Sequence, residues 1–302
     1  MAKKHIGFKA FTFAFMASLA ALGLLSAGIM AAISLTSPVE ESQQSVAGPP
    51  GYQPRAVDSM TILFMGCRDD TVPPDRYLLM RFYPAERVLR LVPVPQELEA
   101  TVNIKTGTLP ELYDYGGVQM VCDAVRNVFS IKVDRYVKYN NEEFIDLVDL
   151  FGGVETNVEQ TTEYTSEKGS TVRLVEGLQL LNGKKLLEYL SSPLVAGLEE
   201  NEALKRRAEL LASGIEQRLV DSIAGRADVL FASFVDLAQT NITNYDYTVR
   251  KEAIGYIAQS EQDKAVYRLI DGSYTGTKDE KRFTPSPEGK EVIQSWFEPY
   301  GD

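Results

Sequence analysis

A run of 26 residues without a charged side chain, residues 10–35, divides this 302-residue chain into two parts of different character. Three lysines precede the run, which is long enough to cross a bilayer as a tilted helix. A cleaved signal peptide is the alternative, because small residues such as Ala27 and Ala31 suit a peptidase. Signal peptides usually have an apolar region of only about 7–15 residues. We therefore expect a retained transmembrane helix at residues 10–35, after a short tail at residues 1–9.

Flanking charges predict the orientation of this helix. Its lysine-rich side should stay in the cytoplasm, and Glu40 and Glu41 follow on the other side. Residues 36–55 are polar, contain Pro and Gly and show no apolar period, so they are typical of a linker. Residues 56–302 are then predicted to form one extracytoplasmic domain, since no shift in composition divides them.

Composition excludes several kinds of active site from that domain. The single histidine is His5, which removes histidine-dependent nucleophilic catalysis and histidine-ligated zinc. Cys67 and Cys122 are too few for a four-cysteine metal site, and buried free thiols are favoured over a disulfide. The chain beyond residue 35 holds 28 basic and 42 acidic residues, a net charge of −14 that argues against nucleic-acid binding.

Apolar patterning predicts an α/β layered domain with a central mixed sheet flanked by helices. Short apolar runs at residues 60–66, 76–83 and 87–94 are typical of strands, with a hairpin turn between the last two. Further strands are expected at residues 134–140 and 154–158. Helices are expected at residues 116–130, 141–153, 178–190, 201–223, 229–239 and 247–258.

Five charged side chains gather between the first two predicted strands. Gly66 allows a sharp turn, and the charges that follow it are Arg68, Asp69, Asp70, Asp75 and Arg76. A solvated loop is one explanation for such a cluster. The other is an anion site, because ligands commonly bind beyond the ends of adjacent strands.

The order of motifs resembles the LytR-CpsA-Psr family of membrane-anchored cell-envelope proteins. The matching pieces are "LFMGCRDD", "PPDRYLLMRFYP", "LVPVPQEL", "YDYGGVQMVCDAV", "FIDLVDLFGGVE", "VEGLQLLNGKKLLEYLSS" and "ALKRRAELL". This resemblance implies binding of a polyprenyl-pyrophosphate-linked glycan, with the prenyl chain in an apolar tunnel. It also implies transfer of the glycan phosphate to peptidoglycan, helped by arginines and by Mg²⁺ on carboxylates.

Two acids keep positions that the family pattern gives to acids. Asp75 matches the aspartate of the family's "SDT" and is the expected magnesium ligand, while Glu97 matches the acid of "PRD". We assign both as candidate catalytic residues. Arg68, Asp69, Asp70 and Arg76 are candidate substrate-binding residues of the same loop, although Arg68 and Asp70 reverse the charges that the family pattern places there.

Several family arginines are replaced in this chain. Gln96 stands for the arginine of "PRD", and Ser191 stands for the first arginine of "YxRxR". In the helix carrying "RxxRQ", Ala203 replaces one arginine, Arg206 keeps the other, and Arg207 replaces glutamine. Gln96, Ser191, Arg206 and Arg207 complete the candidate substrate-binding set.

These replacements leave the activity open. A divergent transferase at the outer face of a bacterial cell membrane, acting on polyprenyl-linked glycan and peptidoglycan, is the main expectation. The first alternative is a non-catalytic module that binds the lipid-linked glycan, because each lost arginine removes a charge-assisted contact worth about 1.5–3 kcal/mol. The second alternative is an envelope-stress regulator or scaffold, for which direct DNA binding is not expected.

Overall fold

The computed structural model describes residues 51–166, 169–277 and 280–297. Within these ranges, no helix is both long enough and apolar enough to cross a bilayer. The predicted cytoplasmic tail, the predicted transmembrane helix and most of the predicted linker lie outside the described residues.

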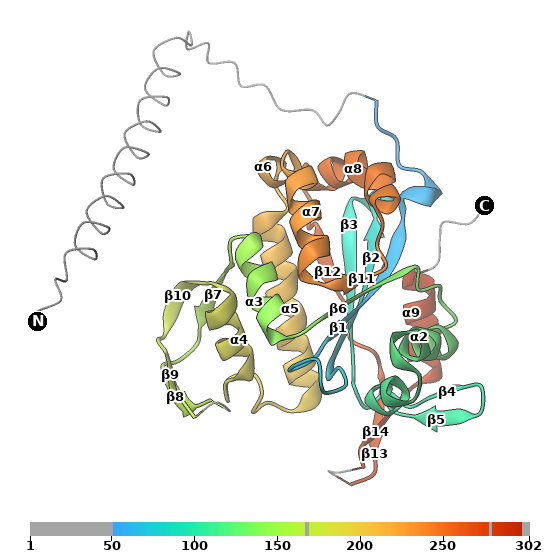
Figure 1. Cartoon of the computed structure of the whole chain (residues 1–302), viewed down its shortest axis with the longest axis vertical. Coiled ribbons are helices and arrows are strands. Elements are labelled where there is room, and N and C mark those ends of the chain that lie inside the picture. The colour runs from blue at the N-terminus through green and yellow to red at the C-terminus, as the bar shows by residue number, and fades with distance from the viewer. Residues whose placement is uncertain (1–50, 167–168, 278–279, 298–302) are drawn as a thin grey trace, which may run out of the picture. The chain divides into compact units, whose positions relative to one another are not determined.

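Three consecutive strands form half of a six-stranded central sheet (Figure 1). β1 (Met60–Gly66), β2 (Arg76–Tyr83) and β3 (Val88–Val94) pair antiparallel in chain order, which confirms the three predicted strands. The short 3-10 helix η2 (Pro84–Glu86) makes the predicted turn between β2 and β3. Arg87 closes this turn in the left-handed conformation, with φ of 57°.

Distant segments supply the rest of the sheet. β6 (Arg135–Tyr139) lies parallel to β1, and β12 (Ala265–Tyr267) lies parallel to β3. The short β11 (Gln239–Thr240) pairs antiparallel with β6. The strand order is β11-β6-β1-β2-β3-β12, so the predicted mixed sheet is confirmed.

Helices cover both faces of this sheet, because successive side chains of a strand point to opposite faces (Figure 1). Leu63 and Val92 belong to a core that includes residues of α2 (Leu109–Phe129) and α9 (Pro287–Phe297). Leu91 points the other way, toward α5 (Glu200–Arg218) and α8 (Asn244–Ala258). Ile62 packs beside α7 (Ala227–Leu237).

A second, smaller core lies next to α5. It is built from two hairpin-like pairs, β7 (Val154–Val158) with β10 (Gly177–Leu181) and β8 (Thr162–Thr165) with β9 (Thr171–Leu174). α3 (Asn141–Leu150) and α4 (Gly183–Ser191) complete it. The remaining described elements are η1 (Ala56–Asp58), β4 (Ala100–Val102), β5 (Lys105–Gly107), α6 (Asp221–Ala224), β13 (Gly272–Thr275) and β14 (Arg282–Pro285).

The predicted helix at residues 178–190 is wrong in its first part. Residues 177–181 form β10, in which Leu178 and Leu180 point to solvent and are 69% and 56% exposed. The helix begins only after Asn182, whose side-chain oxygen accepts a hydrogen bond from the Lys185 backbone N–H at 3.0 Å. Leu178 and Leu180 therefore lie on one face of a strand and the buried Leu181 on the other, and a cap separates them from the helix.

Two further features of the core bear on the sequence predictions. α2 starts at Leu109, seven residues earlier than predicted, because Thr108 and Glu111 form a capping box there. Cys67 and Cys122 are both buried free thiols, as expected.

Candidate functional site

The charged loop at residues 67–75 leaves the carboxyl end of β1, beside the carboxyl end of the parallel strand β6. The loop closes where the Asp75 backbone N–H donates to the Gly66 carbonyl at 3.0 Å. Gly66 is the last residue of β1, as predicted. A Cβ at Gly66 would lie 2.9 Å from Cε2 of Tyr139, so the neighbouring ring explains the glycine.

Arg76 holds this loop against the next helix. Its Nη2 donates to the Cys67 carbonyl at 2.6 Å and to Oδ1 of Asn141 at 2.7 Å, and its Nε donates to Oδ1 of Asp75 at 3.0 Å. Within the described chain, Arg76 Nη1 and Asp75 Oδ2 make no hydrogen bond. A fixed guanidinium whose Nη1 still has both N–H bonds to donate is suited to bind an anion.

Asp70 is turned away from Asp75 and toward β6. Its carboxylate accepts hydrogen bonds from Nζ of Lys138 at 2.9 Å and from Nδ2 of Asn140 at 3.1 Å. The Lys138 side chain is only 7% exposed. Burial alone would lower the pKa of Lys138, but the hydrogen bond that it donates to Asp70 leaves this pKa raised. Lys138 and Asp70 therefore tie the loop to the sheet.

Arg68 and Asp69 occupy the outer part of the loop. Asp69 accepts hydrogen bonds from the backbone and the hydroxyl of Thr71, which lower its pKa, and lies 3.4 Å from Nε of Arg68. Both charged side chains are about half exposed. These contacts are typical of a polar turn.

Arg207 of α5 adds a second guanidinium to the site. Its side chain is partly buried. Burial lowers the pKa of Arg207 most, and the nearby charge of Arg76 lowers it further, whereas Asp75 and Glu97 act in the opposite direction. Among the described residues Arg207 has no hydrogen-bond or ion-pair partner. Two close guanidinium groups, one of them without a partner, create a strong preference for an added anion.

Glu97 flanks this pair of arginines from the segment after β3. Its backbone carbonyl accepts a hydrogen bond from Phe283 at 2.8 Å, which fixes the segment, and its Oε1 accepts one from Nε2 of Gln96 at 3.0 Å. Gln96 is exposed, and this hydrogen bond keeps its side chain next to Glu97. The position at which the family pattern has an arginine therefore lies next to the site.

Arg206 and Ser191 have other neighbours. Arg206 forms an ion pair with Glu159, whose hydrogen bond is the main reason that the pKa of Arg206 is raised. Ser191 is the exposed last residue of α4. Within the described chain, no hydrogen bond or ion pair joins either residue to Arg76, Asp75 or Glu97.

Sequence reasoning missed Lys138 and Asn141, which hold the loop in place. A lysine within an apolar strand pattern is the available signal for Lys138, and the position directly after the helix cap Asn140 is the signal for Asn141. A similar signal marks Arg207, because it follows the buried Ala203 by one helical turn and precedes the buried Leu210 by three residues.

The carboxylates do not form a metal cage. In residues 51–297, apart from the gaps named above, no group of three or more His, Cys, Asp or Glu side chains is arranged to hold a metal ion. Asp75 offers one oxygen without a hydrogen bond, which suits a Mg²⁺ ion bound mainly by phosphate and water. Arg76 and Arg207 can therefore bind a phosphorylated ligand, with the carboxylates of Asp75 and Glu97 near them.

Comparison with known proteins places the chain in a family. The model of the LytR_cpsA_psr family matches residues 28–192, more than half of the chain. The chain belongs to the LytR-CpsA-Psr family. Among curated relatives of this family member, the polyisoprenyl-teichoic acid–peptidoglycan teichoic acid transferases TagU of Bacillus subtilis and Bacillus licheniformis are 32% and 31% identical over 138 residues. The match covers 44% of this chain and 43% of each relative.

Solved structures share the fold of this LytR-CpsA-Psr protein. A putative transcription regulator from Eubacterium siraeum superposes with a TM-score of 0.72 at 17% identity, over 86% of this chain and 98% of that one. TagT bound to LIIa-WTA superposes with a TM-score of 0.61 at 18% identity, over 86% and 97% of the two chains. Bacillus subtilis TagV gives a TM-score of 0.64 at 19% identity, over 79% and 95%.

Proposed function

We propose that this LytR-CpsA-Psr protein binds a polyprenyl-diphosphate-linked glycopolymer at the outer face of a bacterial membrane and attaches the polymer to peptidoglycan. The observation that carries the proposal is the Arg76–Arg207 pair, in which a partly buried guanidinium has no partner among the described residues. The names of the TagU relatives support the class of substrate, and the N-terminal anchor remains part of the proposal.

The chemistry proposed is transfer of a glycosyl phosphate. A hydroxyl group of peptidoglycan attacks the phosphorus next to the glycan, and a new phosphorus–oxygen bond forms. The bridging phosphorus–oxygen bond breaks, so polyprenyl phosphate leaves with the bond's electron pair. Asp75 or Glu97 accepts the hydroxyl proton, and Arg76 and Arg207 neutralise the charge that develops on the phosphate oxygens.

Magnesium is kept as a proposed cofactor. Asp75 would hold the ion together with the diphosphate of the ligand, and the ion would neutralise charge on the oxygens that it binds. The carboxylates of Asp69 and Asp70 are not needed for this role, because both accept hydrogen bonds elsewhere in the loop.

Binding without transfer is the second candidate. Gln96 and Ser191 favour it, since each removes a guanidinium that the family pattern provides. The two candidates differ in one measurement, which is release of polyprenyl phosphate when a lipid-linked glycan and peptidoglycan are both present.

The proposed site is tested by comparing substitutions of Arg207 and of its neighbour in α5, Arg206. Full-length protein in detergent is titrated with geranylgeranyl diphosphate, and binding is measured by calorimetry with and without Mg²⁺. Arg207→Ala should weaken binding roughly 10–100-fold, the loss of one charge-assisted contact, whereas Arg206→Ala should change it less than threefold. Equal losses in the two variants, or no binding by the unmodified protein, would contradict the proposed site.

Mass spectrometry of the purified full-length protein gives an independent check. A polyprenyl phosphate or diphosphate that co-purifies with the unmodified chain, and is reduced in Arg207→Ala, supports the proposed ligand. Retention of the same lipid in both would show that Arg207 does not contact it.

A further inference from the structure

The described chain begins beside a surface at the amino end of β1, opposite the anion site. This surface, here called the entry face, consists of Arg55, Val57, Lys132 and Tyr245. Val57, Lys132 and Tyr245 line one open cavity of about 210 Å³, although they come from η1, the segment before β6 and the start of α8. We propose that the entry face rests on a bilayer surface that contains anionic lipids.

Apolar groups on this face are unusually accessible. Val57 is 56% exposed and Tyr245 is 73% exposed. An exposed valine next to an exposed tyrosine fits the interface of a membrane, where an aromatic ring with a polar tip lies at the level of the headgroups. Val249 lines the same cavity.

On this face the basic side chains are more exposed to solvent than their acidic partners. The Lys132 and Arg55 side chains are 85% and 60% exposed. Their acidic partners are covered, because the Asp134 side chain is 21% exposed and that of Asp58 is completely buried. The charge that this surface exposes is therefore mainly cationic in a domain whose net charge is strongly negative, although both cations are ion-paired and the exposed Glu252 lies near Arg55.

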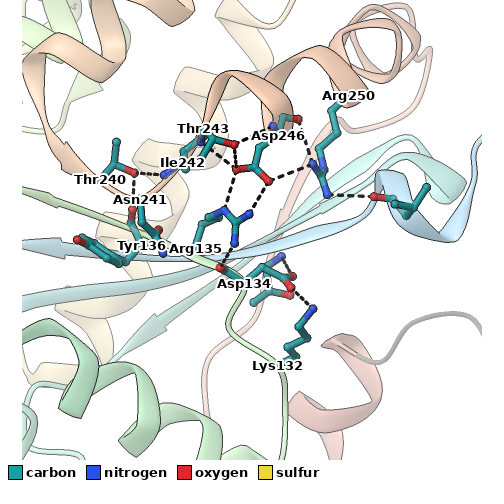
Figure 2. A network of polar contacts seen from close by, with 12 residues as sticks. Lys132, Asp134, Arg135, Tyr136, Thr240, Asn241, Ile242, Thr243, Asp246 and Arg250 are labelled. Carbon is teal, nitrogen blue, oxygen red and sulfur yellow. Dashed lines mark hydrogen bonds and ion pairs between the residues drawn. The ribbon is translucent and has the colours of Figure 1, made fainter.

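A network beneath the face keeps it rigid (Figure 2). Arg135 donates from Nε and Nη2 to both oxygens of Asp246 at 2.8 Å, and Thr243 donates to the same carboxylate. Arg250 donates to the carbonyls of Val57 and Asp58 at 3.0 and 2.9 Å, which fixes η1 on α8. The Asp246 side chain is 5% exposed, so this carboxylate adds little negative charge to the surface.

The short separation along the chain between the entry face and the predicted membrane span is the reason for proposing a bilayer as its binding partner. Fifteen residues separate the predicted membrane span from Gly51. Fifteen residues reach at most about 50 Å even when fully extended, which limits how far the entry face can lie from the lipid headgroups. Each lysine or arginine near an anionic surface contributes about 1 kcal/mol, or about fivefold in binding. This inference does not depend on the proposed transfer reaction.

Cysteine labelling of the full chain in lipid nanodiscs tests the inference. Val57→Cys and Tyr245→Cys carry an environment-sensitive dye, and Ile104→Cys is the matched control because Ile104 is 96% exposed in the β4–β5 turn, far from α8 in Figure 1. Cys67 and Cys122 are buried and should react slowly. Dyes at positions 57 and 245 should be quenched by brominated lipid in phosphatidylglycerol discs, but not in phosphatidylcholine discs, and the dye at position 104 in neither.

Charge reversal separates lipid contact from mere proximity. Lys132→Glu changes the charge of the face by two units, so the ratio of lipid-contacting to free domain should fall roughly 10–30-fold. Raising the salt concentration should act in the same direction. If the full chain does not insert into discs, binding is measured instead by sedimentation with vesicles of the same two lipid compositions. Binding to phosphatidylglycerol vesicles should again exceed binding to phosphatidylcholine vesicles. Dyes at positions 57 and 245 that stay accessible to aqueous iodide in anionic discs, or no binding to anionic vesicles, would overturn the proposal.

Discussion

Asp246 shows how one carboxylate can connect a helix of the domain, α8, to a strand of the central sheet, β6. It accepts hydrogen bonds from Arg135 of β6 and Thr243 at the start of α8, and lies 3.7 Å from Arg250 (Figure 2). Burial alone would raise the pKa of Asp246, but these partners outweigh it and lower the pKa to about 2. The ionised carboxylate is thus favoured in the folded state.

This lowered pKa predicts a loss of stability in acid. Because the folded-state pKa lies below the ordinary value of 3.8, the contribution of Asp246 is complete above about pH 5 and is lost as the pH falls toward 2. Asp246→Asn should cost about 2–4 kcal/mol of the free energy of unfolding at pH 7, since it leaves Arg135 without its ionic partner. Urea unfolding at pH 7 and pH 3 measures both effects, and the variant should lose less stability than the unmodified protein between these values. The same loss in both would show that other carboxylates control the acid response.

Gln96 offers a gain-of-function prediction at the proposed site. Gln96→Arg places a guanidinium beside Glu97, near the Arg76–Arg207 pair, and should tighten binding of geranylgeranyl diphosphate roughly tenfold. Ser191→Arg is the matched control, because no hydrogen bond or ion pair of the described chain links Ser191 to that pair. Calorimetry on both folded variants compares them. Tighter binding by Ser191→Arg alone would mean that the ligand approaches from α4 instead.

Arg206 and Arg207 also show where sequence reasoning reaches its limit at the site. Their pairing in the chain and the family pattern predict that this turn of α5 matters, but adjacent residues of a helix point about 100° apart. The pattern alone therefore assigns both arginines to the ligand. Only the packing of α5 shows that Arg207 lies near Arg76, while Arg206 turns toward Glu159.

At the scale of elements, α2 contains a kink that a side chain would oppose. Gly117 has φ of 65° and ψ of −159°, a conformation essentially restricted to glycine. Gly117→Ala should therefore destabilise the protein by about 1–2 kcal/mol, even though no atom lies within 4 Å of the added Cβ.

Gly255 in α8 is the matched control for that effect. Its Cβ would also meet no atom within 4 Å, but it lies within a regular helix. Gly255→Ala should stabilise the protein by about 0.5–1 kcal/mol. Thermal and urea unfolding of the two variants should give opposite signs. A stabilised Gly117→Ala would show that the kink is not required.

The elements differ in how far the sequence could predict them. β1, β2, β3 and β7 are found because local apolar residues and turn residues specify them. β11 and β12 are too short for a periodic signal, and their pairing with β6 and β3 depends on contacts more than 100 residues away. β10 is mistaken for helix because Leu178 and Leu180 are exposed, so their hydrophobicity does not report the buried face.

At the scale of the molecule, the two cores should differ in local stability. The central sheet has six strands and helices on both faces, whereas β7–β10 and β8–β9 are two-stranded sheets packed around a smaller cluster. Two-stranded sheets are marginal on their own. Amides of β8 and β9 should therefore exchange with solvent at least tenfold faster than amides of β1, as measured by hydrogen–deuterium exchange with mass spectrometry. Equal protection in β1 and β8 would indicate a single cooperative unit.

β1 connects the two proposed surfaces of the molecule, because Met60 lines the cavity at the entry face and Gly66 leads into the anion site. Its seven residues span roughly 23 Å in extended conformation. A domain that rests on its entry face would hold the anion site that far above the headgroups. A diphosphate could reach Arg76 and Arg207 only if its lipid were drawn out of the bilayer over the same distance. The length of β1 would then set a minimum length for the prenyl chain of the lipid-linked substrate. A lipid with a shorter prenyl chain would have to leave the membrane completely to be used.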